Sequence, residues 1–141
     1  MSAAAFLARA GHQVIFYDKA PEPAPVGSGL IVQPTGQAVL AALGSLDALK
    51  QLGARLDRLD GRLPGGTRKV LDVRYEALGS GVHGLSVHRA VLFDLLLQAA
   101  LDNGATLEMG KDVTSADHTD RRFMFSDDTQ SPTFDLIIDA L

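Results

Sequence analysis

Cysteine is absent from the 141-residue sequence. Without thiols, the chain cannot form disulfides, zinc sites built on thiolates or a cysteine nucleophile. Positive charge is also scarce, because 13 Lys and Arg face 17 Asp and Glu for a net charge of −4. This balance argues against non-specific binding to nucleic acids, which needs a basic surface.

Long apolar runs are missing as well. No stretch approaches the roughly 18 consecutive apolar residues of a membrane-spanning helix. Residues 2–12 have no basic segment before their apolar part, and Arg9 interrupts that part, so they do not match a signal peptide. With 46% hydrophobic residues, the chain can bury the core of one domain. We therefore expect a soluble, cytoplasmic domain.

Two common kinds of catalytic motif are not found. No serine lies in a GxSxG setting, which gives a hydrolase triad no support. The sequence contains four histidines, His12, His83, His88 and His118. Their spacing does not match a metal-binding motif such as HxxxH. The sequence therefore predicts no metal site, and it leaves the catalytic residues unknown.

The helices have clear patterns. An alanine-rich helix is predicted at residues 2–10, with Gly11 in the position of a C-cap glycine. Shorter helices are predicted at 37–44 and 46–53, the second capped by Ser45. The longest, at 89–103, carries one apolar stripe formed by Val91, Leu92, Leu95, Leu96, Ala99 and Ala100.

Strands are predicted between and after these helices. The turn "PGG" at 64–66 divides a hairpin over residues 55–73. The other predicted strands cover residues 13–18, 29–33, 83–88, 105–109, 111–118, 121–126 and 134–141. Strands that alternate with helices indicate an α/β fold with a parallel sheet, and the last strands indicate an antiparallel β-meander. The chain starts on a helix with no strand before it and ends on an apolar strand, so we expect an incomplete sheet.

Three segments together resemble a known family. They are "ARAGHQVIFYDKAPEPAPVGSGLIVQPTG", "LSVHRAVLFDLLLQAA" and "DLIIDAL". In this order and at this spacing they resemble the FAD-binding domain of the group-A flavoprotein monooxygenases, the family of para-hydroxybenzoate hydroxylase. The resemblance implies an incomplete Rossmann-like FAD-binding domain over residues 1–141. In the family, a first strand and a GxGxxG turn precede the first helix, and this sequence contains no GxGxxG.

The resemblance implies a set of cofactor-binding residues. Asp18, at the tip of its strand and followed by Lys19, matches the acid that holds the adenosine ribose. Taken alone, a turn acid in solvent would be the simpler interpretation of Asp18. Arg89, at the start of the long helix, matches an arginine that reaches FAD. The segment beside the flavin is matched by Gly27, Ser28, Gly29 and Gln33, where glycines allow close approach of the backbone.

Two further positions complete the comparison with the family. Val113 matches a position whose backbone meets the adenine, although its side chain indicates only a strand. The end of "DLIIDAL" departs from the family signature GADG, because Asp139 replaces its first glycine and Leu141 stands in place of the aspartate. This departure counts against a flavin contact from that segment.

The function implied by the resemblance is flavin-dependent hydroxylation of a small aromatic substrate, with FAD as cofactor and NAD(P)H and oxygen as co-substrates. Because the glycine turn is missing, we expect this chain alone to hold FAD weakly or not at all, to self-associate and to be inactive. Two alternatives stay open. One is a non-catalytic fragment or interaction domain that does not hold flavin and forms a homodimer through exposed strand edges. The other is an NAD-dependent dehydrogenase domain, which Asp18 fits equally well but the meander does not.

Overall fold

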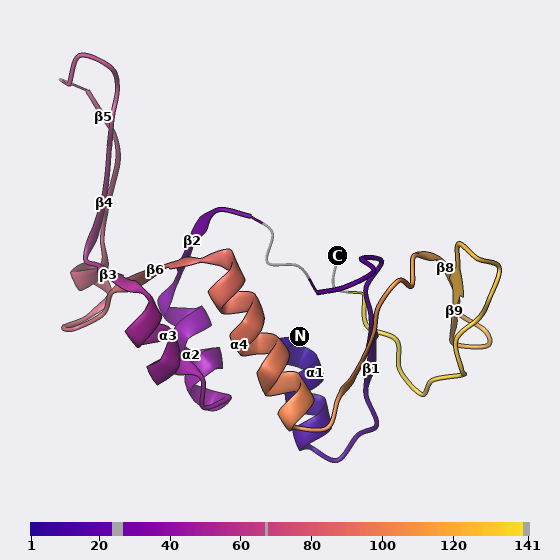
Figure 1. Cartoon of the computed structure of the whole chain (residues 1–141). Helices are drawn as coiled ribbons and strands as arrows, with labels where there is room; N and C mark the ends of the chain where they lie inside the picture. The colour runs from indigo at the N-terminus through magenta and orange to yellow at the C-terminus, as the bar shows by residue number, and fades with distance from the viewer. Residues whose placement is uncertain (24–26, 67, 140–141) are drawn as a thin grey trace.

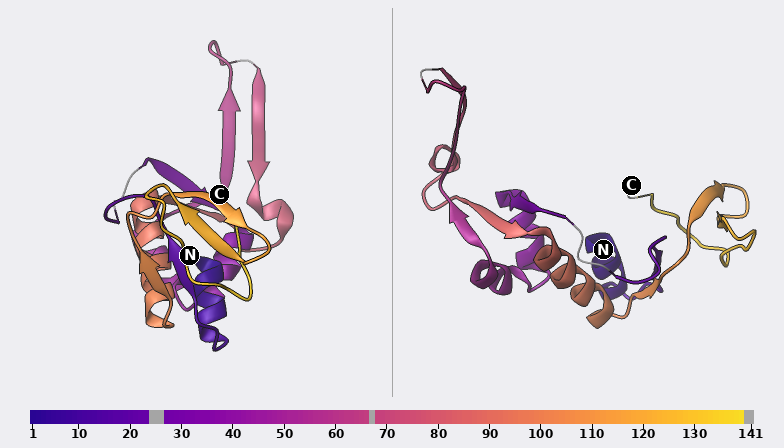
Figure 2. Two further views of the ribbon diagram at one scale, coloured as in Figure 1. Left: turned by 90° about the vertical axis from the view of Figure 1, so that its right-hand side faces the viewer. Right: turned by 45° about the horizontal axis from the view of Figure 1, so that its top comes forward.

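The computed structural model describes residues 1–23, 27–66 and 68–139, and Figure 1 shows their course. The described chain forms an elongated row of small sheets with four α-helices at its centre. Two antiparallel hairpins lie at the two ends of the row, and the views in Figure 2 show one of them projecting away from the helices. The fold is α/β, with one parallel pair of strands and several antiparallel ones, as the sequence predicts.

The parallel pair lies beside the first and last helices. Strand β1 (Ile15–Tyr17) pairs with β7 (Thr106–Glu108) in parallel. Helices α1 (Ser2–Arg9) and α4 (Arg89–Asp102) pack on each other next to this pair. Small side chains allow the close approach of the two helices, and the buried cluster consists of Ala4, Ala5, Ala8, Ala99, Ala100 and Ala105.

One edge of β1 has no partner strand among the described residues. The amide of Asp18 donates to the carbonyl of Glu108 at 3.0 Å, and the amide of Thr106 donates to the carbonyl of Val14 at 2.9 Å. Backbone groups alternate in direction along a strand, so those of Ile15 and Tyr17 point to the opposite edge. This edge can accept another strand.

The second core lies under an antiparallel sheet. Strands β2 (Gly29–Val32) and β3 (Ala54–Leu56) flank β6 (Gly84–His88), and helices α2 (Pro34–Ala42) and α3 (Leu46–Leu52) pack nearby. The apolar stripe of α4 contributes its first four members to this core and its two alanines to the other. The fully buried centre is formed by Val32, Leu40, Leu49, Leu85 and Val87.

Strands β4 (Arg58–Arg62) and β5 (Lys69–Arg74) form the projecting hairpin, followed by a 3₁₀ turn at Tyr75–Leu78. One face is a ladder of ion pairs in which Asp72 accepts from Arg58 Nε at 2.7 Å and from Lys69 Nζ at 2.8 Å. These hydrogen bonds hold the pKa of Asp72 far below its usual range, and a hydrogen bond from Arg62 lowers the pKa of Asp60. Both carboxylates therefore stay ionised at neutral pH.

The other end of the molecule is a hairpin of β8 (Val113–Asp117) and β9 (Arg122–Phe125). It is joined to β1 by an aromatic cluster, in which the ring of Tyr17 meets Phe123, Phe125 and Phe134 edge-on at 5.1–6.5 Å between centroids. The Tyr17 hydroxyl is buried there without a hydrogen-bond partner among the described residues, and burial raises its pKa.

Two local predictions are wrong. The predicted strand at 134–141 is not formed over 134–139, and residues 140–141 lie outside the described part. A strand needs a neighbour for its backbone groups, and the described residues supply none there, so Leu136 and Ile138 remain exposed. Ser45 occupies the N-cap of α3, but its side chain makes no capping hydrogen bond because its backbone is helical rather than extended.

None of the helices among residues 1–23, 27–66 and 68–139 is both long and apolar enough to cross a membrane.

Helix α3 offers a matched test of the second core. Leu49 is fully buried, whereas Leu52 in the same helix is 61% exposed. We expect Leu49→Ala to lower the free energy of unfolding by about 2–5 kcal/mol, because it removes buried methyl groups and leaves a cavity. Leu52→Ala should change it by less than about 1 kcal/mol. Urea unfolding of both variants measures the difference, and equal losses would show that α3 does not pack as described.

Candidate functional site

Residues Gly27–Gly29, here called the glycine segment, contact the start of α4, although about 60 residues separate the two in the chain. Strand β2 pairs with β6 so that Gly29 lies opposite His88, and the amide of Arg89 donates to the carbonyl of Ser28 at 3.2 Å. A Cβ atom on Gly27 would lie 2.8 Å from Cδ of Arg89. The positive φ of 125° at Gly27 also favours glycine. The structure therefore brings Gly27, Ser28, Gly29 and Arg89 together.

A small cavity lies beside Arg89 at the N-terminus of α1. It has a volume of about 270 Å³ and is lined by Met1, Ser2, Arg89, Leu92, Phe93 and Leu96. The first amides of a helix have no intrahelical acceptor, and the helix dipole places partial positive charge there. The N-cap residue of α1 makes no side-chain capping bond. Arg89 and the start of α1 thus offer positive charge and hydrogen-bond donors to an anion in one place.

Asp18 directly follows β1 and is half-buried, and Lys19 beside it is exposed. One carboxylate oxygen of Asp18, Oδ1, accepts from the amide of Ala20 at 2.8 Å. No other donor in the described part of the chain bonds to this side chain. Asp18 therefore has a fixed orientation with accepting capacity left, which is what a ribose diol requires.

Two of the predicted residues have structural partners. Gln33 accepts through Oε1 a hydrogen bond of 2.9 Å from the hydroxyl of the buried Tyr75. This contact fixes the turn between β2 and α2. Val113 begins β8, pairs with Phe125 and is 39% exposed, so it lies on the terminal hairpin and not beside the glycine segment and Arg89.

Several residues near the site have no functional signal in the sequence. The cavity wall formed by Leu92, Phe93 and Leu96 belongs to the apolar side of α4, and its pattern indicates core packing only. Gln37 is another such residue: it is buried and donates to the carbonyls of Val32 and His83 at 3.1 and 2.8 Å. It links β2 to the start of β6. Its position in the first turn of a helix gives no sequence signal for that role.

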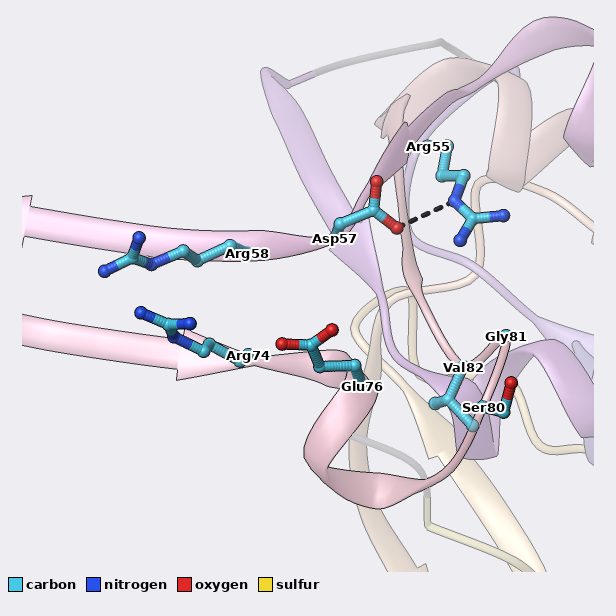
Figure 3. A pocket seen from close by; sticks show the side chains of 8 residues that line it. All are labelled: Arg55, Asp57, Arg58, Arg74, Glu76, Ser80, Gly81 and Val82. Atoms are coloured by element: carbon cyan, nitrogen blue, oxygen red, sulfur yellow. Dashed lines mark hydrogen bonds and ion pairs between the residues drawn. The ribbon is translucent and has the colours of Figure 1, made fainter.

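A larger cavity of about 560 Å³ lies at the base of the β4–β5 hairpin, and Figure 3 shows the side chains that line it. Charges of both signs meet there, and Arg55 is paired with Asp57 at 2.8 Å. Arg58 and Arg74 point along the hairpin, away from Ser80 and Val82. The charged groups therefore do not converge on one point, and this cavity is a weaker candidate than the site at Arg89.

Metal-ligating side chains do not gather in the described part of the chain, where no group of three or more His, Asp or Glu could hold an ion. His83 and His88 make local hydrogen bonds instead, His83 with the carbonyl of Gly81 and His88 with the amide of Ala90. The second of these satisfies one amide at the start of α4.

Comparison with known proteins finds a curated relative and several solved structures of similar fold. No family model matches the chain. Among curated proteins, 3-hydroxybenzoate 6-hydroxylase 1 of Aquipseudomonas alcaligenes is 32% identical over 108 residues, which cover 74% of this chain and 27% of that protein. The chain thus spans about a quarter of the length of this relative.

Solved structures agree in fold. The tetrameric form of 2-methyl-3-hydroxypyridine-5-carboxylic acid oxygenase matches with a TM-score of 0.77 and 21% identity, covering 94% of this chain and 34% of that one. The p-nitrophenol 4-monooxygenase of Pseudomonas putida matches with a TM-score of 0.67 and 14% identity, over 92% and 34% of the two chains. Aklavinone-11 hydroxylase, solved with FAD and aklavinone, matches with a TM-score of 0.60 and 18% identity, over 92% and 28%.

The backbone at Gly27 provides a test of the local geometry. We expect Gly27→Ala to lower the free energy of unfolding by about 1–3 kcal/mol, because alanine is strained at this φ and its Cβ meets Arg89. Gly29→Ala is the matched control, since a Cβ there would lie at an ordinary 3.7 Å from the carbonyl of Val87. Thermal unfolding of both variants checks this. If Gly29→Ala is as destabilising as Gly27→Ala, the close approach of Gly27 to Arg89 is not present in solution.

Proposed function

The chain is a relative of the FAD-dependent aromatic hydroxylases, and on this premise we propose that it forms part of an FAD-binding domain of a flavin monooxygenase. The observation that carries the proposal is the contact between the glycine segment and Arg89 at the mouth of a cavity that also includes the start of α1. The cavity of about 270 Å³ is smaller than the pockets of 300–1,000 Å³ that enclose whole ligands. It therefore fits one portion of a long dinucleotide.

Each part of the site suits a different part of the cofactor. Asp18 would accept hydrogen bonds from the adenosine ribose. Arg89 and the first amides of α1 would hold the pyrophosphate, because their positive charge attracts the negatively charged phosphate oxygens. The backbone at Gly27 and Gly29, which has no side chains there, would pass beside the ribityl chain and the flavin, where a side chain would collide. We propose that Lys19, Gln33 and Val113 contact the same cofactor. Gln33 would lie at its flavin end and Val113 at its adenine end.

Bound FAD would supply the redox chemistry by which NAD(P)H and oxygen hydroxylate a small aromatic substrate. The residues of this chain would bind and orient the cofactor, and the apolar side chains of Leu92, Phe93 and Leu96 would keep water from it. The chain spans 27–34% of the length of the hydroxylase relatives described above. We therefore propose this activity for a protein that contains the chain, acting in the cytoplasm.

A second candidate is an interaction domain that does not hold flavin. The open edge of β1 favours it, because the backbone groups of Ile15 and Tyr17 can pair with a strand of another molecule. Two chains could pair in this way as a homodimer. Flavin binding separates the two candidates, since only the first requires Arg89 and Asp18 to contact a ligand.

The role of Arg89 can be tested by substitution. We expect Arg89→Ala to weaken FAD binding about tenfold or more, since a charge-assisted hydrogen bond contributes about 1.5–3 kcal/mol. The melting temperature without FAD should change little, because Arg89 is exposed. Quenching of flavin fluorescence measures the affinity, with Arg68→Ala on the far hairpin as control. A loss of melting temperature equal with and without FAD would make Arg89 a structural residue.

Asp18 can be tested without breaking its turn. Asp18→Asn keeps an oxygen that can accept from the amide of Ala20 but removes the negative charge. We expect FAD binding to weaken by about 1–3 kcal/mol, whereas Asp94→Asn on the exposed side of α4 should leave it unchanged. The measurement is flavin retained after dialysis. Unchanged retention in Asp18→Asn would remove Asp18 from the site, and no binding by any folded variant would favour the interaction domain.

A further inference from the structure

The two ends of the molecule carry opposite charge. Residues 54–82, which include the β4–β5 hairpin, contain six Lys or Arg and four Asp or Glu, for a net charge of +2. Residues 111–139, which include β8–β9 and the segment after it, contain three Lys or Arg and seven Asp, for a net charge of −4. Figure 1 shows these two hairpins at opposite ends of the chain, on either side of the helices. A single molecule therefore cannot bring them into contact.

The excess charge at both ends is accessible. On the basic end, the side chain of Arg68 makes no hydrogen bond or ion pair with a described residue, and the ion pair of Arg74 with Asp72 is long, at 3.7 Å. On the acidic end, the side chains of Asp112, Asp120 and Asp135 are exposed and have no hydrogen bond or ion pair with the described residues. Hydrogen bonds lower the pKa of Asp117 and of Asp127, so these carboxylates also remain charged.

Both ends also expose apolar side chains beside their charges. On the hairpin, the face opposite the ion-pair ladder carries the cross-strand pairs Leu59–Val73 and Gly61–Leu71. Leu71 is 46% exposed there, and Val70 nearby is 58% exposed. In the segment that follows β9, Leu136 is 68% exposed. Apolar surface next to uncompensated charge is typical of sites that contact another protein.

We propose that the basic β4–β5 hairpin of one molecule binds the acidic β8–β9 end of a second copy of the same chain. The opposite net charges, the exposed apolar groups at each end and their separation along the molecule support this occupant over an unrelated partner. Such a contact joins different surfaces of the two copies, so each copy keeps one free end and the assembly can extend beyond a dimer. It does not involve the open edge of β1 or the cavity at Arg89, and it does not depend on flavin binding.

A charge exchange between two variants tests the proposal. In the first variant, Arg68→Glu and Arg74→Glu change the hairpin end from +2 to −2, and Asp72 keeps its bonds to Arg58 and Lys69. In the second, Asp112→Lys, Asp120→Lys and Asp135→Lys change the other end from −4 to +2. Both ends of the first variant are then negative, and both ends of the second are positive. Molecules of one variant should therefore repel each other and attract molecules of the other variant.

Sedimentation velocity at low salt measures the outcome. We expect the unaltered chain to self-associate. Each variant alone should associate at least about tenfold more weakly, and an equal mixture of the two variants should recover the association. Raising the salt to about 0.5 M should weaken association of the unaltered chain, because it shortens the screening length to a few ångströms. Circular dichroism confirms that each variant is folded.

Three results would overturn the proposal. The first is a chain that remains monomeric at low salt. The second is association that the charge reversals and salt leave unchanged, which would point to pairing along the edge of β1. The third is a mixture of folded variants that associates no better than either variant alone.

Discussion

The pairing of β2 with β6 is the contact on which the rest of the structure depends. It places Gly29 opposite His88, and so it sets the start of α4 against the glycine segment. The same two strands supply Val32, Leu85 and Val87 to the second core. Because α4 runs from this core to the alanine cluster under α1, the pairing also places Arg89 next to the N-terminus of α1. One antiparallel register thus sets both the packing and the cofactor site.

Small residues determine how closely these parts can approach. The alanines of α1 and α4 allow the two helices to pack without large side chains between them. At the other core, a Cβ on Gly84 would lie 2.8 Å from the hydroxyl of Tyr75, the same hydroxyl that donates to Gln33. Glycine at that position keeps Tyr75 in place, and Tyr75 in turn fixes the turn that follows β2. The strand that follows Gly27 is therefore held at its C-terminal end.

The helices could be predicted from the sequence because their apolar stripes and terminal glycines depend only on neighbouring residues. The stripe on α4 and the glycines after α1 and α2 act within a few residues, and the structure confirms them. The segment 134–139 was predicted incorrectly because strand formation depends on a partner that no local pattern reveals. For the same reason, no local pattern indicated that β3 would pair with β6 apart from the hairpin. The proximity of Gly27 and Arg89 was expected only from the family resemblance, since contacts over such a separation have no periodic signal.

The most direct test of the cofactor site is a map of amide chemical-shift changes when FAD is added to the ¹⁵N-labelled chain. We expect the changes to cluster at the first turn of α1, at Gly27–Gly29, at Arg89 and Ala90, and at Ala20, whose amide bonds to Asp18. Changes confined to Ser80, Gly81 and Val82 would place the ligand in the cavity at the base of the hairpin instead. Such a result would contradict this placement of the cofactor.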